Sequence, residues 1–137
     1  MKLFLDSSAF AKRFVEEKGS QQVQDLCSQA TELCLCVLCV LEVVSALNRR
    51  LREKNLTRLQ YQQAKQSLAQ EVNDAIVIDL TPEVVRLGIE VLEASPVQTM
   101  DALQIASALA WQADLFASAD HRQTTAAKAA KLHTRQI

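Results

Sequence analysis

Four acidic residues of this chain lie where an α/β protein could use them for chemistry. Asp6 and Asp120 each follow a short apolar run, while Glu42 and Asp101 lie in segments that are otherwise nearly all apolar. None of these four segments contains a lysine or an arginine. Because acidic side chains are seldom buried without a partner, carboxylates brought together here would need cations from outside the chain.

Carboxylate oxygens are hard ligands, so the cations that suit them are Mg²⁺ or Mn²⁺ rather than zinc or copper. Two such ions about 4 Å apart can hold a phosphodiester, polarise its oxygens and generate a hydroxide nucleophile. The four acids therefore predict metal-assisted hydrolysis of phosphodiester bonds. We expect them to converge on the ions in a single negatively charged hollow.

Each acid also has a purely structural interpretation. Asp101 and Asp120 could be acids at helix starts that interact with the helix dipole, and Asp6 could be a turn residue between a strand and a helix. Glu42 is harder to explain in this way, because a lone carboxylate on an apolar helix face is costly. The four positions together favour the chemical interpretation over the structural one.

Apolar runs bounded by polar residues predict the strands that would position these acids. They cover residues 2–6, 33–38, 75–80 and 115–118, with a fifth strand, at an edge, over 132–135. Helical spacing of apolar residues and N-terminal capping residues predict helices between the strands. These run from the Ser7-Ser8 pair to about residue 17, and then over about 21–30, 39–51, 57–73, 82–95, 100–111 and 122–131.

Strands that alternate with helices, several of them continuously apolar, predict an α/β fold. We expect a three-layer α/β/α sandwich around a mostly parallel sheet of four or five strands, formed by residues 1–137 as one domain. In such sheets the ligand crevice lies beyond the carboxyl ends of the strands. The four acids follow strands or begin helices, so their side chains are expected at one end of the sheet.

Composition excludes several other functions. Two glycines, Gly19 and Gly88, cannot form a glycine-rich phosphate loop or a dinucleotide-binding fingerprint, and two histidines argue against a zinc enzyme with histidine ligands. A phosphatase with an aspartyl nucleophile would need a second acid two residues after Asp6, where the chain has Ser8. Aromatic residues, which stack on bases, make up only 4% of the chain, and Tyr61 is expected to be the most exposed of them.

The N-terminus lacks the apolar stretch of a signal peptide, and the longest apolar run, residues 33–41, is far shorter than the roughly 20 residues of a membrane-spanning helix. The chain is therefore expected to be soluble and cytoplasmic, without membrane contact. Three of the four cysteines lie within residues 34–39, where we expect reduced thiols that behave as small buried hydrophobic groups. The spacing of Cys36 and Cys39 leaves a redox role open.

The formal net charge of −1 conceals an uneven distribution of charge. Residues 49–65 carry a net charge of +5 and residues 121–137 a net charge of +4. An RNA backbone could follow these segments, with Arg49, Arg50 and Arg122 as candidate contacts to its phosphates. The alternative is that these charges belong to ordinary solvated helix faces.

The four acidic segments resemble the motifs of the PIN-domain family, and within it those of the VapC-like ribonuclease toxins of type II toxin–antitoxin systems. The matching segments are FLDSSA around Asp6, LEVVSAL around Glu42, MDALQIA around Asp101 and SAD ending at Asp120. Their order and approximate spacing also agree, over essentially the whole chain. This chain has Gln104 where many members carry histidine, and it has Cys39 in place of the usual serine or threonine cap before the glutamate.

The resemblance implies a Mg²⁺- or Mn²⁺-dependent endoribonuclease that acts as a toxin, forms a dimer and is silenced by a cognate antitoxin. By similarity, Asp6 and Asp101 would be the main metal ligands, with Glu42 and Asp120 completing the site directly or through water. Two hydroxyl groups would support these carboxylates: Ser7 and Ser118. The alternatives are a metal-dependent phosphohydrolase of another kind and a PIN-like module that binds a partner protein without catalysis.

Overall fold

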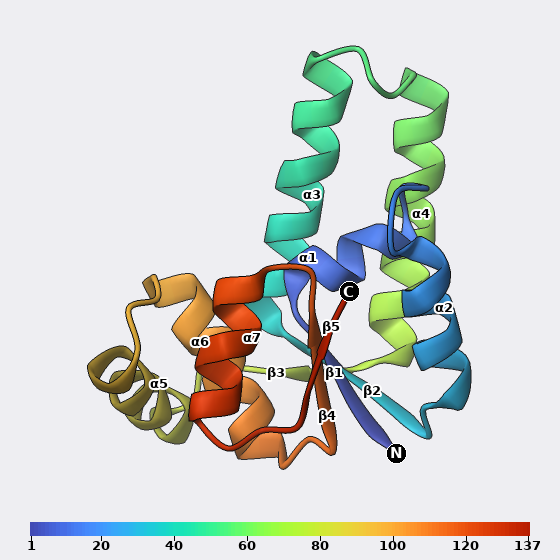
Figure 1. Cartoon of the computed structure of the whole chain (residues 1–137). Helices are drawn as coiled ribbons and strands as arrows, with labels where there is room; N and C mark the ends of the chain where they lie inside the picture. Colours follow the sequence, from blue (N-terminus) through green and yellow to red (C-terminus); the bar gives the residue numbers. More distant parts are fainter.

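The computed structural model describes residues 1–137 as three layers, in which helices cover both faces of a sheet (Figure 1). The strands are β1 (Lys2–Leu5), β2 (Glu32–Cys36), β3 (Ile76–Ile78), β4 (Leu115–Ser118) and β5 (Thr134–Gln136). The helices are α1 (Ser7–Phe10), α2 (Ser20–Gln29), α3 (Val37–Arg52), α4 (Arg58–Asp74), α5 (Pro82–Ala94), α6 (Thr99–Trp111) and α7 (His121–Ala129). A short 3₁₀ helix, η1 (Ala11–Arg13), follows α1 directly.

The five strands are all parallel and lie in the order β3-β2-β1-β4-β5, which confirms the predicted parallel sheet and its edge strand. The chain moves outward from β1 through β2 to β3, and then returns to place β4 on the other side of β1. The direction of winding therefore changes between β1 and β4. In folds of this kind, ligands bind beyond the carboxyl ends of the strands at such a switch point.

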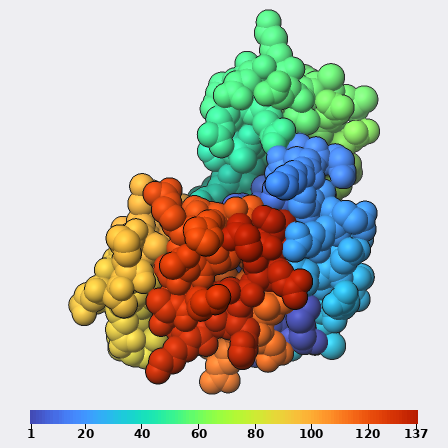
Figure 2. All heavy atoms as spheres, viewed as in Figure 1, coloured from blue at the N-terminus to red at the C-terminus, as the bar shows by residue number.

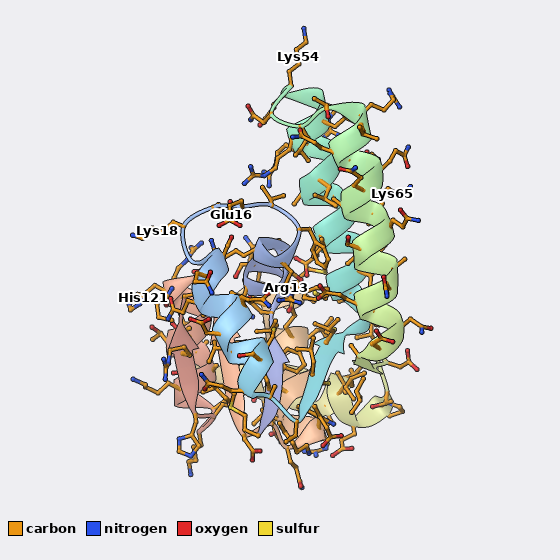
Figure 3. The ribbon with its side chains drawn as sticks, turned by 90° about the vertical axis from the view of Figure 1, so that its right-hand side faces the viewer. Arg13, Glu16, Lys18, Lys54, Lys65 and His121 are labelled. Atoms are coloured by element: carbon orange, nitrogen blue, oxygen red, sulfur yellow. The ribbon has the colours of Figure 1, made fainter.

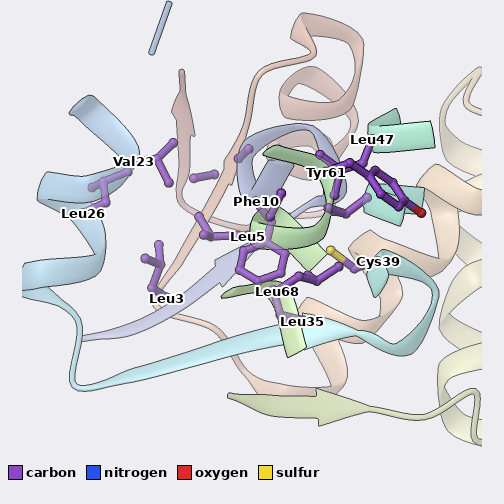
Figure 4. Close-up of a cluster of buried hydrophobic side chains, with 14 residues drawn as sticks. Leu3, Leu5, Phe10, Val23, Leu26, Leu35, Cys39, Leu47, Tyr61 and Leu68 are labelled. Atoms are coloured by element: carbon purple, nitrogen blue, oxygen red, sulfur yellow. The ribbon is translucent and has the colours of Figure 1, made fainter. Parts of the chain in front are cut away.

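Alternating side chains of the strands divide the core into two hydrophobic clusters, one on each face of the sheet. Leu3, Leu5 and Leu35 belong to the cluster formed with α1, α2, α3 and α4 (Figure 4). Phe4 and Phe116 belong to the other cluster, formed with α5, α6 and α7, and their rings stack with centroids 5.5 Å apart. Because both faces of the sheet are covered, the ends of the strands are the places where a ligand can reach it.

Local sequence accounts for the starts of several helices. Thr57 and Gln60 form a reciprocal capping box at the start of α4. The Thr81 hydroxyl accepts a hydrogen bond from the backbone N–H of Val84, just before the proline that opens α5. At α6, the sequence pattern suggested Thr99 as the capping residue, but Gln98 is the N-cap and Thr99 is the first residue of the helix.

The first predicted helix is shorter in the structure than the sequence suggests. Instead of continuing to about residue 17, the helical segment ends with η1, and the chain is irregular from there to Gly19. Gly19 has a φ of 92°, and the Ser20 hydroxyl accepts a hydrogen bond from the backbone N–H of Glu17. Glycine and serine favour such local turns over a helix interior, which explains the early end.

The cysteines are free thiols, as predicted, and three of them are buried. α3 begins at Val37 instead of residue 39, so Cys39 lies within its first turn. Cys36 belongs to the cluster with α6 and Cys39 to the cluster with α3 and α4, so the two thiols do not share an exposed surface. Burial raises the pKa of the Cys34 and Cys39 thiols to about 12, which keeps both protonated and unreactive.

α3 and α4 pack side by side and extend beyond the rest of the molecule (Figures 1 and 2). Lys54 marks the tip of this hairpin and Lys65 lies along α4 (Figure 3). The predicted exposure of Tyr61 is wrong: its side chain is 8% exposed, because it faces α3 and joins the core cluster with Leu47. Across the whole chain, no helix has both the length and the apolar character needed to span a membrane.

Candidate active site

Asp6 lies directly beyond β1, at the switch point of the sheet, and serves as the N-cap residue of α1. Its Oδ1 accepts hydrogen bonds from the Ala9 backbone N–H at 2.9 Å and from the Ser8 hydroxyl at 2.7 Å, and its Oδ2 accepts one from the Ser118 hydroxyl. Asp6 itself, and not the serine hydroxyls expected from the sequence, therefore caps α1. Hydrogen-bond donors in α1 and β4 thus fix both carboxylate oxygens of Asp6.

Burial dominates the electrostatics of Asp6, which is only 4% exposed. Loss of hydration raises the pKa of this carboxyl to about 6, against the lowering effect of the Ser118, Ala9 and Ser8 hydrogen bonds. The negative charge of Asp101 raises the pKa further. An acid in this position gains from a cation that replaces its lost hydration.

Glu42 lies in the second turn of α3 and is partly buried. Its Oε1 accepts two hydrogen bonds, from the Ser7 hydroxyl at 2.7 Å and from Gln104 Nε2 at 2.6 Å. These contacts link α3 to the β1–α1 junction and to α6. A lone carboxylate in apolar surroundings would be costly, but two neutral hydrogen-bond donors beside Glu42 offset this cost.

Asp101 and Asp120 are less buried and less constrained than Asp6. Asp101 lies in the first turn of α6, and burial and the charge of Asp120 raise its pKa, while Arg122 opposes this effect. Asp120 is the N-cap residue of α7, and its Oδ1 accepts a hydrogen bond from the backbone N–H of Arg122 at 2.9 Å. Gln123 Nε2 donates to the backbone carbonyl of Asp101 at 3.1 Å, which ties α7 to the start of α6.

The structure thus places the four acids at one end of the sheet, and we refer to them as the acidic row. Glu42 shares a contact with Ser7, next to Asp6, while the charge of Asp101 acts on Asp6 and the charge of Asp120 acts on Asp101. None of them takes part in an ion pair: the four salt bridges of the molecule join other residues. The expectation of one common cage is not met, since no three acidic, histidine or cysteine side chains are grouped closely enough to hold a metal ion. Each acid is held by its own element: Asp6 at the start of α1, Glu42 in α3, Asp101 in α6 and Asp120 at the start of α7.

The donor set still suits magnesium or manganese. All four groups offer oxygen ligands, and Mg²⁺ commonly binds through one or two carboxylates while keeping several waters and adding substrate phosphates. Asp6 and Asp101 are near enough for one charge to raise the pKa of the other, as expected of a pair that shares a cation. The residues present therefore fit a hard divalent ion.

A hollow of about 480 Å³ lies beside these acids and is not lined by the four acids themselves. Ser8 and Ala119 form its border with the acidic side, while Arg49 and Arg50 line its other wall. Arg50 also pairs with Glu17 at 2.5 Å. Arg122, the third predicted contact, lies apart, against a hollow of about 310 Å³ between α7 and the segment before α6.

Sequence reasoning overlooked three side chains that support the acids. Ser8 donates to Asp6 and accepts from the backbone N–H of Ala119, so it joins β1–α1 to the loop after β4. Gln104 and Gln123 are both buried and contact Glu42 and the backbone of Asp101. Both are glutamines three residues after a candidate acid, and Gln104 also lies in a largely apolar stretch, which was the available signal.

Comparisons with known proteins decide the family. A family model for the PIN domain matches residues 3–129. The chain belongs to the PIN domain family. No curated protein sequence gives a significant match to it.

Solved structures share the fold of this PIN-domain chain at low identity. VapC20 of Mycobacterium tuberculosis, a toxin that cleaves the sarcin-ricin loop, is 16% identical, with a TM-score of 0.70 over 90% of this chain and 94% of that chain. VapBC2 of Rickettsia felis, bound to promoter DNA, is 10% identical, with a TM-score of 0.73 over 100% and 99%. FitAcB of Neisseria gonorrhoeae is 12% identical, with a TM-score of 0.72 over 96% and 95%.

Proposed function

We propose that this PIN-domain chain is a metal-dependent endoribonuclease and the toxin of a type II toxin–antitoxin pair. The observation that carries the proposal is the group of four carboxylates, none of them in a salt bridge, at the switch point of a parallel sheet. Such a row attracts divalent cations, and phosphodiester hydrolysis is the chemistry that clustered Mg²⁺ or Mn²⁺ ions support. The similarity in fold to VapC20, which cleaves a ribosomal RNA loop, supports RNA as the substrate.

In this proposal Asp6 and Asp101 hold the metal ion, and Glu42 and Asp120 contact it directly or through water. The bound ion would polarise the phosphodiester and lower the pKa of an attacking water. The protein's own contribution is to hold the carboxylates in place. Ser118 and its neighbouring donors restrain Asp6, and Asp101 lies in the first turn of α6.

The basic segments give the RNA backbone a path to these acids. Arg49 and Arg50 line the hollow that borders the acidic row, and Arg122 lies on the other side, at the start of α7. A phosphate in the hollow would compete with Glu17 for Arg50. We infer that these arginines contribute to affinity for RNA and not to the chemical step.

The proposed partners are a cognate antitoxin and a second copy of the chain. Several structural neighbours are toxin–antitoxin complexes, which supports the antitoxin. Large apolar side chains are exposed on one side of α5, at Val85, Ile89 and Leu92, and also at Leu41 of α3 and Leu59 of α4. Exposed apolar surface of this kind favours protein contacts.

Cleavage of mixed RNA by the purified protein tests the proposal. We expect cleavage in Mg²⁺ or Mn²⁺, none with EDTA, and a loss of more than about a hundredfold in Asp6→Asn and Asp101→Asn, because even residues that only support metal ligands are worth 10- to 100-fold. Expression should be toxic to cells, and either substitution should relieve the toxicity. RNA cut equally well by both variants, or an intact protein that binds a partner but cuts no RNA, would contradict the proposal.

A further inference from the structure

Gln104 lies in α6 one turn after Asp101, and its side chain is only 2% exposed. The residues around it in the helix, Ala102, Ile105 and Ala106, are buried and apolar. A buried amide is costly unless its donors and acceptor are all used. The contacts of this amide therefore indicate what it does in the fold.

The Gln104 amide is fully engaged with the first and second acidic segments. Its Oε1 accepts a hydrogen bond from the backbone N–H of Ser7 at 3.0 Å, and its Nε2 donates to the Ser7 hydroxyl at 2.7 Å and to Glu42 Oε1 at 2.6 Å. The Ser7 hydroxyl in turn donates to the same Glu42 oxygen at 2.7 Å. Gln104, Ser7 and Glu42 thus form a closed triangle of hydrogen bonds.

The orientation of this amide is determined by its neighbours. The backbone N–H of Ser7 can only donate, so it must face the amide oxygen of Gln104. A rotated amide would direct its oxygen at the Glu42 carboxylate and leave the Ser7 N–H without an acceptor. Gln104 can therefore hold Glu42 in one position only.

Two neutral donors occupy Glu42 Oε1, while Oε2 receives no hydrogen bond from the protein. A lysine or arginine in place of Gln104 would cancel the charge of Glu42, but an amide and a hydroxyl leave that charge available to an external cation. The same contacts restrict a side chain that otherwise has several freely rotating bonds. Oε2 is thus the oxygen left free for an external ligand.

We propose that Gln104 is a positioning residue, which acts with Ser7 to fix Glu42 so that its Oε2 faces a metal ion or a metal-bound water. This inference rests on the proposed function, because it assigns Glu42 a place in the metal site. Gln104 also connects three of the acidic segments, because it lies in α6 with Asp101 and contacts both Ser7, next to Asp6, and Glu42 in α3.

Mn²⁺ titration by calorimetry tests this without using activity. We expect Gln104→Met, which keeps the volume but removes the donors, to weaken Mn²⁺ binding about tenfold. Gln70→Met, on the exposed face of α4, serves as the matched control and should bind as the wild type does. Unchanged Mn²⁺ affinity in a folded Gln104→Met protein would overturn the proposal.

A double-mutant cycle separates positioning from a general structural role. Gln104→Met should lower kcat about tenfold with little change in KM, but should cost almost nothing further once Glu42→Ala is present. Equal losses in both backgrounds would show that Gln104 does not act through Glu42. If Gln104→Met fails to fold, Ser7→Ala should give a smaller loss that is also absent in the Glu42→Ala background, and additive losses would again overturn the proposal.

The two proposals fail in different ways. A wild-type protein that binds Mn²⁺ but cuts no RNA would overturn the proposed function, while the titration of Gln104→Met would still decide the role of Gln104. A wild-type protein that cuts RNA, together with a Gln104→Met variant of unchanged Mn²⁺ affinity and rate, would overturn the positioning role alone.

Discussion

The two halves of the acidic row differ in how the protein holds them. On one side, Asp6 is almost fully buried and Glu42 partly so, and hydroxyl, amide and backbone donors fix three of their four carboxylate oxygens. On the other side, Asp101 and Asp120 are partly exposed, and their carboxylates accept only one hydrogen bond, from the backbone N–H of Arg122. The first half is rigid before any ligand arrives, and the second can adjust to one.

This difference shows how a fold can keep like charges together without supplying cations. Neutral donors stabilise the buried Asp6 and the partly buried Glu42, while Asp101 and Asp120 rely more on solvent. A site built in this way keeps its negative charge for a ligand. In the proposed metal site, the rigid half would set the position of the ion, and the adjustable half would complete its coordination.

The largest expected effect contrasts Asp6→Asn with Asp120→Asn. In the proposed metal site, Asp6 would be the rigid ligand and Asp120 would complete the site from the adjustable half. We therefore expect Mg²⁺-dependent RNA cleavage to fall more than about a hundredfold in the first variant and about tenfold in the second. Initial rates on one RNA substrate, with the folded fraction checked by circular dichroism, measure both. Equal losses would remove the distinction between the halves.

The next effect is the pH dependence of stability in the metal-free protein. The folded state holds the Asp6 proton more tightly than the unfolded state, since the pKa is about 6 instead of 3.8. The free energy of unfolding should therefore fall as the pH rises from about 4 to about 6, by about 3 kcal/mol from this group. Urea denaturation in EDTA across this range measures it.

Substitution identifies the source of that pH dependence. Asp6→Asn should remove most of it and make the metal-free protein more stable near pH 7, whereas Asp120→Asn should keep the wild-type profile. A profile that is equally steep in Asp6→Asn would mean that a different group is responsible.

A smaller effect is expected from Ser118→Ala, which removes a buried donor to Asp6. We expect a loss of about 2 kcal/mol in unfolding free energy near pH 7, since the remaining carboxylate oxygen stays buried, and a smaller loss near pH 4, where Asp6 is protonated. Thr125→Ala, which removes an exposed hydroxyl from α7, is the control and should change stability by less than about 0.5 kcal/mol. Equal losses at both pH values would contradict the proposed contact.

The smallest effect concerns Gln123, the buried glutamine of the adjustable half. Its Nε2 contacts the Asp101 carbonyl, but its Oε1 is buried without a partner. Gln123→Met loses one hydrogen bond and also removes an unsatisfied oxygen, so the unfolding free energy should change by less than about 1 kcal/mol.

Gln104→Met, which leaves the Ser7 N–H and Glu42 without partners, should cost about 2–3 kcal/mol by the same denaturation measurement.

Sequence patterns predicted most of the fold because they act locally. The apolar runs located the strands, and Thr57 and Thr81 indicated where α4 and α5 begin. Predictions that depended on distant contacts were wrong in places. Tyr61 is buried because α3 packs on α4. The predicted length of the helix after β1 was also wrong, but for a local reason, the turn at Gly19 and Ser20.

The chain alone determined which acids could do chemistry, since their residue types and their places after strands and at helix starts are written in the sequence. Only the tertiary structure decided how they relate to one another, because the separations between carboxylates depend on helix packing across residues far apart in the chain. The triangle of Ser7, Glu42 and Gln104 and the buried state of Asp6 both follow from that packing.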